Sequence, residues 1–208
     1  MLTVCWAAKG GSGTTVAASA MALSQPGPTL LIDLAGDVPL VVGCREAEQP
    51  GVFDWLASDV GTDRLTWIEQ PITDDLAVIP AGEERTARSD RWRALAEHLA
   101  CEPRHVIVDA GTGEPPPALV GVADAALLVT RACYLSLTWA SRQAARPSGV
   151  ILIAEPGRAM GRDDVERSVG APVVATVLLD PKIARAVDSG LAVSRLPKAC
   201  TDQLRAAA

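Results

Sequence analysis

Short, uninterrupted runs of apolar residues recur along this chain, and longer stretches of mixed apolar and polar residues separate them. The runs lie at residues 2–8, 29–33, 76–80, 105–109, 125–130, 149–154 and 172–179. A run of this length is typical of a strand that other elements cover on both faces, as happens in parallel sheets. The pattern therefore predicts a sheet of about seven buried strands.

Helical patterns occupy several of the intervals between the runs. They lie at residues 16–23, 51–57, 90–100 and 136–145. Strands that alternate with helices predict crossover connections and a parallel sheet with helices on both faces. We therefore expect an α/β fold of three layers, α/β/α, with a mostly parallel, doubly wound sheet. A chain of 208 residues suits one such domain, spanning residues 1–208, and no second domain is expected.

The longest irregular region follows residue 33 and contains the short helical pattern at 51–57. Phe53 and Trp55 are the large aromatic residues of this pattern. They are expected either to pack into the core or to belong to a surface that binds a partner. The sequence leaves both interpretations open.

A glycine-rich segment joins the first predicted strand to the first predicted helix. Three glycines in this segment allow backbone N–H groups to turn toward phosphate oxygens at the helix N-terminus, where the helix dipole favours negative charge. The strand, turn and helix context is the one that a phosphate-binding loop requires. The alternative is a glycine turn that only reverses the chain. The predicted nucleotide-binding residues are Lys9, Gly10, Gly11, Ser12, Gly13, Thr14 and Thr15.

Two aspartates end predicted strands, Asp33 in the run 29–33 and Asp109 in the run 105–109. The carboxyl ends of parallel strands meet at one edge of a sheet, so both aspartates are expected beside the phosphate loop. The hydroxyl of Thr15 can ligate Mg²⁺ there, and Asp109 can hold the ion through a water molecule. The alternative for Asp109 is a cap on the turn that follows it.

The loop, Lys9-Gly-Gly-Ser-Gly-Thr-Thr15, resembles the deviant phosphate loop of the ParA/MinD ATPases, which usually reads K-G-G-x-G-K-S/T. Residues 30–34 are similar to the second strand of that family, 106–113 to its Walker B segment and 125–130 to a later core strand. The similarity covers nearly the whole chain. It implies the fold of the P-loop NTPases of the SIMIBI class, with ATP or ADP and Mg²⁺ as ligands.

The resemblance also assigns roles to two charged residues. Lys9 matches the family's signature lysine, which reaches across a homodimer to the nucleotide of the other protomer, and it is a candidate catalytic residue. Asp33 matches the first aspartate of the family's second strand and is the other catalytic candidate. If the nucleotide site is inactive, Lys9 is expected to be a solvated surface residue.

Two positions near the expected phosphates depart from the family pattern. Thr14 stands where the family has a lysine, whose charge-assisted hydrogen bond to phosphate is worth about 1.5–3 kcal/mol. Members that hydrolyse ATP commonly read D-x-D, but Ala35 replaces the second aspartate, and a methyl group cannot orient water. Asp37 lies two residues further on, about 6–7 Å along an extended chain, which argues against its acting instead. We expect weak nucleotide binding and weak or lost hydrolysis.

A third departure concerns the base. The family often carries an asparagine after the strand at 149–154 that reads the edge of adenine, and Glu155 occupies this neighbourhood. Its carboxylate can accept a hydrogen bond from an amino group but cannot donate one. The identity of the base stays open.

The resemblance implies a protein that dimerises on nucleotide and positions or recruits other machinery through protein partners, as in chromosome partition, division-site placement or pilus assembly. One alternative is a nucleotide-independent scaffold similar to the pilus-assembly proteins TadZ and CpaE, whose phosphate loops are often degenerate. A second alternative is an active partitioning ATPase. A metabolic ligase of the same superfamily ranks last, because it would need the missing lysine more.

The overall charge bears on the partners. With a net charge of −6 and an isoelectric point near 4.9, the chain as a whole repels nucleic acid, so DNA is a disfavoured partner. Arg85, Arg88, Arg91 and Arg93 can form a local basic edge. Acidic residues are interleaved with them, and such a run is more often a solvated helix face.

Cysteine usage and hydropathy bear on the compartment. The 5 cysteines are widely scattered and form no C-x-x-C pair, which argues against a disulfide framework and a zinc site and fits a reducing cytoplasm. No apolar run approaches the length of about 18 residues that a spanning helix needs. Residues 196–208 lack the apolar stripe of a membrane-targeting helix. We expect a cytoplasmic protein.

Overall fold

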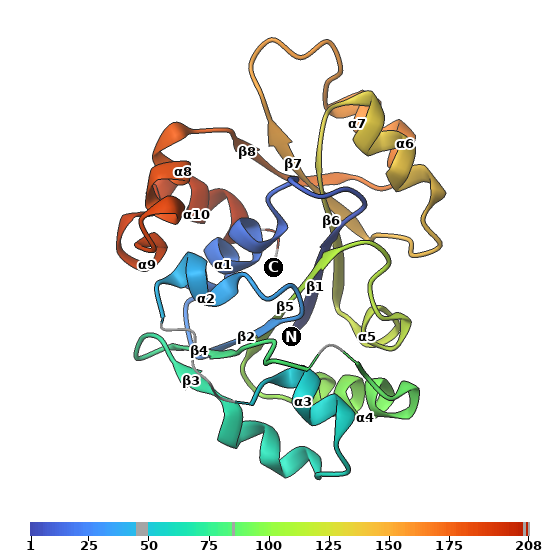
Figure 1. Cartoon of the computed structure of the whole chain (residues 1–208). Helices are drawn as coiled ribbons and strands as arrows, with labels where there is room; N and C mark the ends of the chain where they lie inside the picture. The colour runs from blue at the N-terminus through green and yellow to red at the C-terminus, as the bar shows by residue number, and fades with distance from the viewer. Residues whose placement is uncertain (45–49, 85, 206, 208) are drawn as a thin grey trace.

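Eight strands form one sheet at the centre of the computed structural model, which describes residues 1–44, 50–84, 86–205 and 207 (Figure 1). The strands are β1 (Leu2–Ala7), β2 (Thr29–Asp33), β3 (Gln70–Pro71), β4 (Leu76–Ile79), β5 (His105–Thr112), β6 (Ala125–Arg131), β7 (Gly149–Ala154) and β8 (Val173–Leu178). Their order across the sheet is β3-β4-β2-β5-β1-β6-β7-β8. All neighbouring pairs are parallel except β3 with β4.

The predicted fold class is confirmed, and the seven predicted strands correspond to all of these except β3. This strand contains only Gln70 and Pro71 and pairs antiparallel with β4 at the edge of the sheet. It has no apolar run, so the hydrophobic pattern carried no signal for it. An edge position also suits a proline, which cannot donate a backbone hydrogen bond.

The end of β5 differs from the prediction. β1 and β5 pair regularly up to Cys5 with Asp109, and after a bulge the pairing resumes at Ala7 with Thr112. Gly111, at φ +66°, adopts the left-handed conformation that lets the chain make this irregular step. The prediction that Asp109 ends its strand is therefore wrong, because the strand continues to Thr112.

Helices cover both faces of the sheet. The helices are α1 (Thr14–Ser24), α2 (Val38–Val42), α3 (Val52–Ala57), α4 (Ser89–Ala100), α5 (Pro117–Val122), α6 (Tyr134–Arg142), α7 (Arg162–Val169), α8 (Pro181–Asp188), α9 (Ala192–Arg195) and α10 (Lys198–Arg205), with a 3₁₀ helix, η1 (Thr62–Ile68). The four helical patterns read from the sequence correspond to α1, α3, α4 and α6. Among the described residues, none of these helices has the length and apolar character needed to cross a bilayer.

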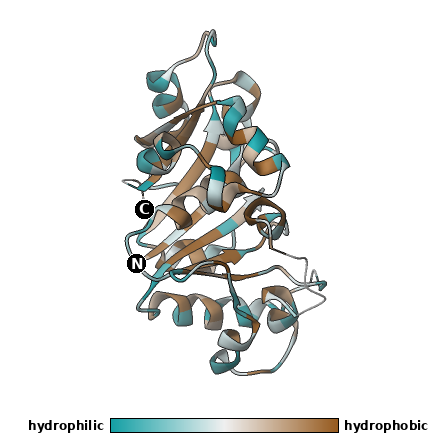
Figure 2. Ribbon diagram, turned by 90° about the vertical axis from the view of Figure 1, so that its left-hand side faces the viewer, coloured by the Kyte–Doolittle hydropathy of each residue, from teal (hydrophilic) through white to brown (hydrophobic). Residues whose placement is uncertain are grey.

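Two cores lie on opposite faces of the sheet because successive strand residues point in opposite directions. β1 sends Val4 and Trp6 to the core under α3, α4, α5 and α6, and Cys5 to the core under α1, α2 and α10. A smaller cluster lies between α6, α7 and the last two strands. Figure 2 shows the apolar strands enclosed between helices whose outer faces are more polar. This is the three-layer arrangement expected from the sequence.

The region of Phe53 and Trp55 packs inward. Trp55 is buried, and its indole Nε1 donates a hydrogen bond to the carbonyl of Gly61 at 3.0 Å. Phe53 is half-buried and meets Trp92 of α4 edge to face, with ring centroids 6.0 Å apart. Of the two interpretations of this region, packing into the core is the one that the contacts support.

The arginine run of residues 85–93 makes internal contacts. Arg88 forms ion pairs with Asp59 and Asp90. The guanidinium of Arg91 lies 3.7 Å from the centre of the Trp55 ring. Arg85 lies outside the described residues. Two of the arginines that composed the candidate basic edge are thus already engaged within the chain.

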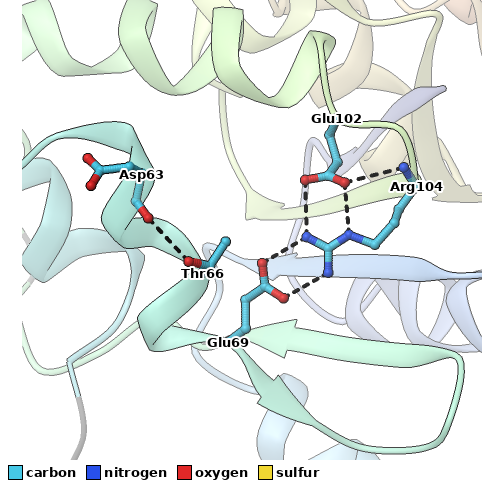
Figure 3. Close-up of polar contacts among 5 residues, drawn as sticks. All are labelled: Asp63, Thr66, Glu69, Glu102 and Arg104. Atoms are coloured by element: carbon cyan, nitrogen blue, oxygen red, sulfur yellow. Dashed lines mark hydrogen bonds and ion pairs between the residues drawn. The ribbon is translucent and has the colours of Figure 1, made fainter.

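A cluster of ion pairs connects the region after η1 to the turn between α4 and β5 (Figure 3). Arg104 donates two hydrogen bonds to Glu69, at 2.7 and 2.8 Å, and two to Glu102, at 2.8 and 3.0 Å. The three side chains are only 11–24% exposed. Hydrogen bonds from Arg104 hold the pKa of Glu102 below its ordinary value. One guanidinium thus joins two segments that are 35 residues apart in sequence.

We expect Arg104→Met to lower the free energy of unfolding by about 2 kcal/mol, because it leaves two poorly solvated carboxylates without their cation. Urea denaturation of the variant and the wild type measures the change. The matched control is Arg167→Met, which removes an exposed ion pair to Asp164 and should cost less than about 1 kcal/mol. Equal effects of the two substitutions would contradict a stabilising role for the cluster.

Candidate functional site

The glycine-rich segment forms a loop at the carboxyl end of β1 and leads into α1. Gly11 and Gly13 have φ values of +75° and +86°, a conformation that other residues rarely adopt. The Ser12 hydroxyl donates a hydrogen bond to the Lys9 carbonyl at 2.7 Å and closes the turn. Gly13 precedes α1, where no side chain of the described residues caps the helix and the first turn has no acidic residue. The amides of this turn are therefore available to an anionic ligand.

A cleft of about 460 Å³ opens over the loop. It is lined by residues 11–16, by Leu34, Ala35 and Asp37 after β2, and by residues 110–112 of β5. The carboxyl ends of three parallel strands thus meet in one space, as the sequence predicted. Five of the predicted nucleotide-binding residues, those from 11 to 15, belong to this lining, whereas Lys9 and Gly10 lie outside it.

Asp109 lies buried beneath the cleft. Its Oδ1 accepts a hydrogen bond from the Gly111 amide at 3.0 Å, and the Thr15 side chain also bonds the carboxylate. Burial raises the pKa of Asp109 above its ordinary value, although the bond from Thr15 opposes the rise. Within the described part of the chain, Oδ2 has no hydrogen-bond partner. A bound cation or its water would satisfy this oxygen, so Thr15 and Asp109 fit the predicted magnesium set.

Asp33 is buried next to Asp109, its register partner on the neighbouring strand. Its carboxylate accepts backbone hydrogen bonds from Ala35 at 2.9 Å, Gly36 at 2.7 Å and Val38 at 3.2 Å. Burial raises the pKa of Asp33 to about 6, even though the bond from Gly36 opposes the rise. Both carboxylate oxygens hold the turn after β2 in shape. A catalytic role for Asp33 stays a prediction.

Asp37 is a cleft residue that the sequence analysis set aside. The argument against it assumed an extended chain, but Gly36, at φ +94°, turns the chain back toward the loop. Asp37 therefore lines the cleft together with Ala35, and its charge helps to raise the pKa of Asp109 after burial. That assumption was wrong. The glycine at position 36 was the signal in the sequence that a turn follows Asp33.

Glu155, expected near the base, lies at the end of β7 between two cations. It forms ion pairs with Arg131 of β6, at 2.8 Å, and with Arg158. Arg158 and Lys9 also lie close enough to Cys133 to affect its thiol. Partial burial opposes ionisation of Cys133, but hydrogen bonding with Ser136 and the two cations hold its pKa below the ordinary value. Positive charge thus gathers on the β6 and β7 side of the loop.

Comparison with known proteins adds evidence on the fold. No protein-family model and no curated protein matches the sequence. Solved structures do match: a ParA family ATPase from Chlorobium tepidum TLS has a TM-score of 0.75 and 19% identity, over 97% of this chain and 96% of that one. MinD from Pyrococcus horikoshii OT3, complexed with Mg-ADP, has a TM-score of 0.76 and 19% identity, over 99% and 93%. A MinC:MinD cell division protein complex from Aquifex aeolicus matches with a TM-score of 0.76 and 18% identity, over 98% of this chain and 93% of that one.

This chain has the ParA/MinD fold. The resemblance read from the loop and strands is thereby confirmed at the level of the fold. An identity of 19% carries no conclusion about ligand or activity.

Two of the three departures from the family pattern, Thr14 and Ala35, lie in the cleft. Thr14 is buried and presents a hydroxyl where the pattern has an ammonium group, and Ala35 presents a methyl group. Among the described residues, the cleft lining contains no lysine or arginine. Lys9 stays at the rim, where its Nζ contacts the Gly10 carbonyl at 3.3 Å. The cleft thus combines free amides and carboxylates with very little positive charge.

The raised pKa of Asp33 predicts a pH effect on stability. Ionising this carboxyl costs more free energy in the folded protein than in the unfolded chain. The stability that the neutral carboxyl provides is therefore complete below the ordinary pKa near 3.8 and is lost as the pH rises through about 6. As the pH rises from about 4 to about 6.5, the free energy of unfolding of Asp33→Asn should increase by about 2–3 kcal/mol relative to that of the wild type. Urea denaturation across this range tests it. A difference between the two proteins that does not change with pH would refute the prediction.

Proposed function

We propose that this protein is a ParA/MinD-like nucleotide-binding protein that acts as a dimeric positioning or recruitment factor and hydrolyses ATP weakly or not at all. One observation carries the proposal. The N-terminus of α1 and the side chain of Thr15 line one cleft, and Asp109, whose Oδ2 has no hydrogen-bond partner among the described residues, lies buried next to the lining residues 110–112. Amides of this kind suit phosphate oxygens, and the two side chains suit Mg²⁺.

The proposed loss of hydrolysis follows from what the cleft lacks. Thr14 and Ala35 line it, but the first has no charge for the transferring phosphoryl group and the second has no oxygen to orient water. Removal of one such transition-state contact typically slows a reaction by about 10²–10³-fold. Nucleotide binding can survive these losses because the amides and the magnesium ligands remain.

A homodimer is supported by the face beside the loop. α6 begins near the carboxyl end of β6, the parallel neighbour of β1, so it rises from the same edge of the sheet as the loop. Tyr134, Leu135 and Trp139 of this helix are 78%, 51% and 49% exposed. A second copy docked there would cover this apolar surface and bring its own Lys9 toward the opposite cleft. MinD of Aquifex aeolicus, which shares the fold, assembles with MinC, and we propose that this chain also has protein partners.

Two alternatives are favoured by single observations. The shortage of cations in the cleft favours a scaffold that dimerises without nucleotide, similar to TadZ and CpaE. Asp37, whose carboxylate lines the cleft beside Ala35, favours an active partitioning ATPase, because it can orient the attacking water. A scaffold dimerises in the absence of nucleotide, and an active ATPase releases phosphate in an Asp37-dependent manner. The process served, whether partition, division or pilus assembly, follows from partners that bind these surfaces.

Two further assignments belong to the proposal. The 5 cysteines are free thiols in the structure, which supports a reducing cytoplasmic location. The net charge of −6 and the internal contacts of Arg88 and Arg91 disfavour DNA as a partner.

We expect saturable binding of Mg-ATP that weakens at least about 10-fold in Asp109→Asn, because the amide keeps the shape of the side chain but cannot bind the cation as a carboxylate does. Titration with a fluorescent ATP analogue, with and without Mg²⁺, measures the affinity. In the absence of Mg²⁺ the variant and the wild type should differ little. No binding up to millimolar ATP would eliminate the nucleotide switch and leave the scaffold.

We also expect Mg-ATP to convert the protein from monomer to dimer and Lys9→Ala to stay monomeric at the same occupancy, because its ammonium acts on the partner's nucleotide. Analytical ultracentrifugation measures the oligomeric state. The matched control is Lys182→Ala, an exposed lysine on α8 that lies outside the cleft. Dimers of Lys9→Ala that equal the wild type would contradict the assigned role of Lys9.

A further inference from the structure

We propose that Arg131 supplies to the nucleotide phosphates the positive charge that Thr14 does not. This inference rests on the proposed function and names the residue that makes the degenerate loop able to bind an anion. It concerns the side of the loop that faces β6 and β7, opposite the carboxylates of Asp33 and Asp109.

The position of Arg131 follows from the sheet. It is the last residue of β6, which lies between β1 and β7 and pairs in parallel with both. Its side chain therefore starts at the same sheet edge as the phosphate loop. A second cavity, of about 190 Å³, reaches from Ser12 and Gly13 of the loop across to β8 and α8. Arg131 lines this cavity and is the one basic residue in its described lining, in which Asp180 and Asp188 carry the negative charge.

The ion pair of the Arg131 side chain leaves guanidinium donors for a ligand. Its Nη1 contacts Glu155 Oε1 at 2.8 Å, and this is its one ion pair among the described residues. Its Nε is buried and has no hydrogen-bond partner in the part of the chain that the structure describes. A guanidinium carries five N–H donors in a rigid plane, so fixing one nitrogen fixes the direction of the others. A buried donor without a partner is costly, and a phosphate oxygen is the acceptor that an arginine binds most strongly.

Glu155 acts as a positioning residue for Arg131. It lies at the end of β7, is mostly buried, and also binds Arg158. Two arginines on one carboxylate leave a net positive charge beside the loop. Glu155 thus holds the cation in place without neutralising the group around it.

The carboxylates at the phosphate cleft create the need for such a cation. Asp37, Asp33 and Asp109 line or underlie the phosphate cleft, whose described lining has no basic residue. One Mg²⁺ offsets only part of the charge that these carboxylates and a nucleotide bring together. In the proposed arrangement, a cation on the β6 side draws the phosphates away from the carboxylates. The metal lies near Asp109, and the phosphates lie between the metal and Arg131.

The test is a double-mutant cycle in the full chain with Mg²⁺ and fluorescent ADP as the probe. The variants are Arg131→Gln, Thr14→Lys and the two combined, with Arg167→Gln as a control for the loss of one exposed positive charge. We expect Arg131→Gln to weaken binding about 10- to 100-fold in the Thr14 background. In the Thr14→Lys background, Arg131→Gln should lower the affinity for ADP less than about threefold, because the lysine restores the missing charge. Arg167→Gln should bind as the wild type does.

Three results would overturn the proposal. Unchanged affinity in Arg131→Gln shows that the residue does not touch the nucleotide, while the proposed function stands. An equal loss in both backgrounds, with the unfolding midpoints unchanged, assigns Arg131 to the base or to the shape of the site and not to the missing charge. No binding of ADP to the wild type at millimolar concentration refutes the proposed function itself, and the inference fails with it.

Discussion

The parallel pairing of β1 with β5 on one side and with β6 on the other determines where each candidate group lies. Parallel strands present their carboxyl ends at one edge of the sheet. The loop after β1, Asp109 of β5 and Arg131 of β6 therefore all lie at this edge. The bulge at Gly111 lets β5 continue past Asp109 without losing its pairing to β1. A change in the order of these strands would separate the amides from both charged groups.

Charge is distributed unevenly around the loop. Asp33 and Asp109 are buried under one side, where burial raises the pKa of each. Arg131 and Arg158 share Glu155 on the other side. Under the proposed function, the metal and the phosphates use these two sides separately.

Most of the fold could be predicted because strands covered on both faces leave long apolar runs, and seven of the eight strands have one. β3 could not, since two residues at a sheet edge bury too little to leave a pattern. The cleft residues at 11–15 were also predictable, because closely spaced glycines between a strand and a helix are typical of a phosphate-binding turn. Asp37 was set aside because an extended chain was assumed where Gly36 makes a turn. The conformation of a short loop depends on what it packs against.

By itself the sequence determined the layered fold, the glycine-rich loop between β1 and α1, and the two departures from the family pattern at Thr14 and Ala35, because these follow from hydrophobic periodicity and from local side-chain chemistry. Only the tertiary structure decided which distant groups meet at the loop. It gave Asp33 the backbone amides of its own turn, left Oδ2 of Asp109 without a partner among the described residues, and placed Arg131 and Glu155 together at the neighbouring strand ends. Such pairings join residues far apart in the chain, and they depend on strand order and register, which no local pattern encodes.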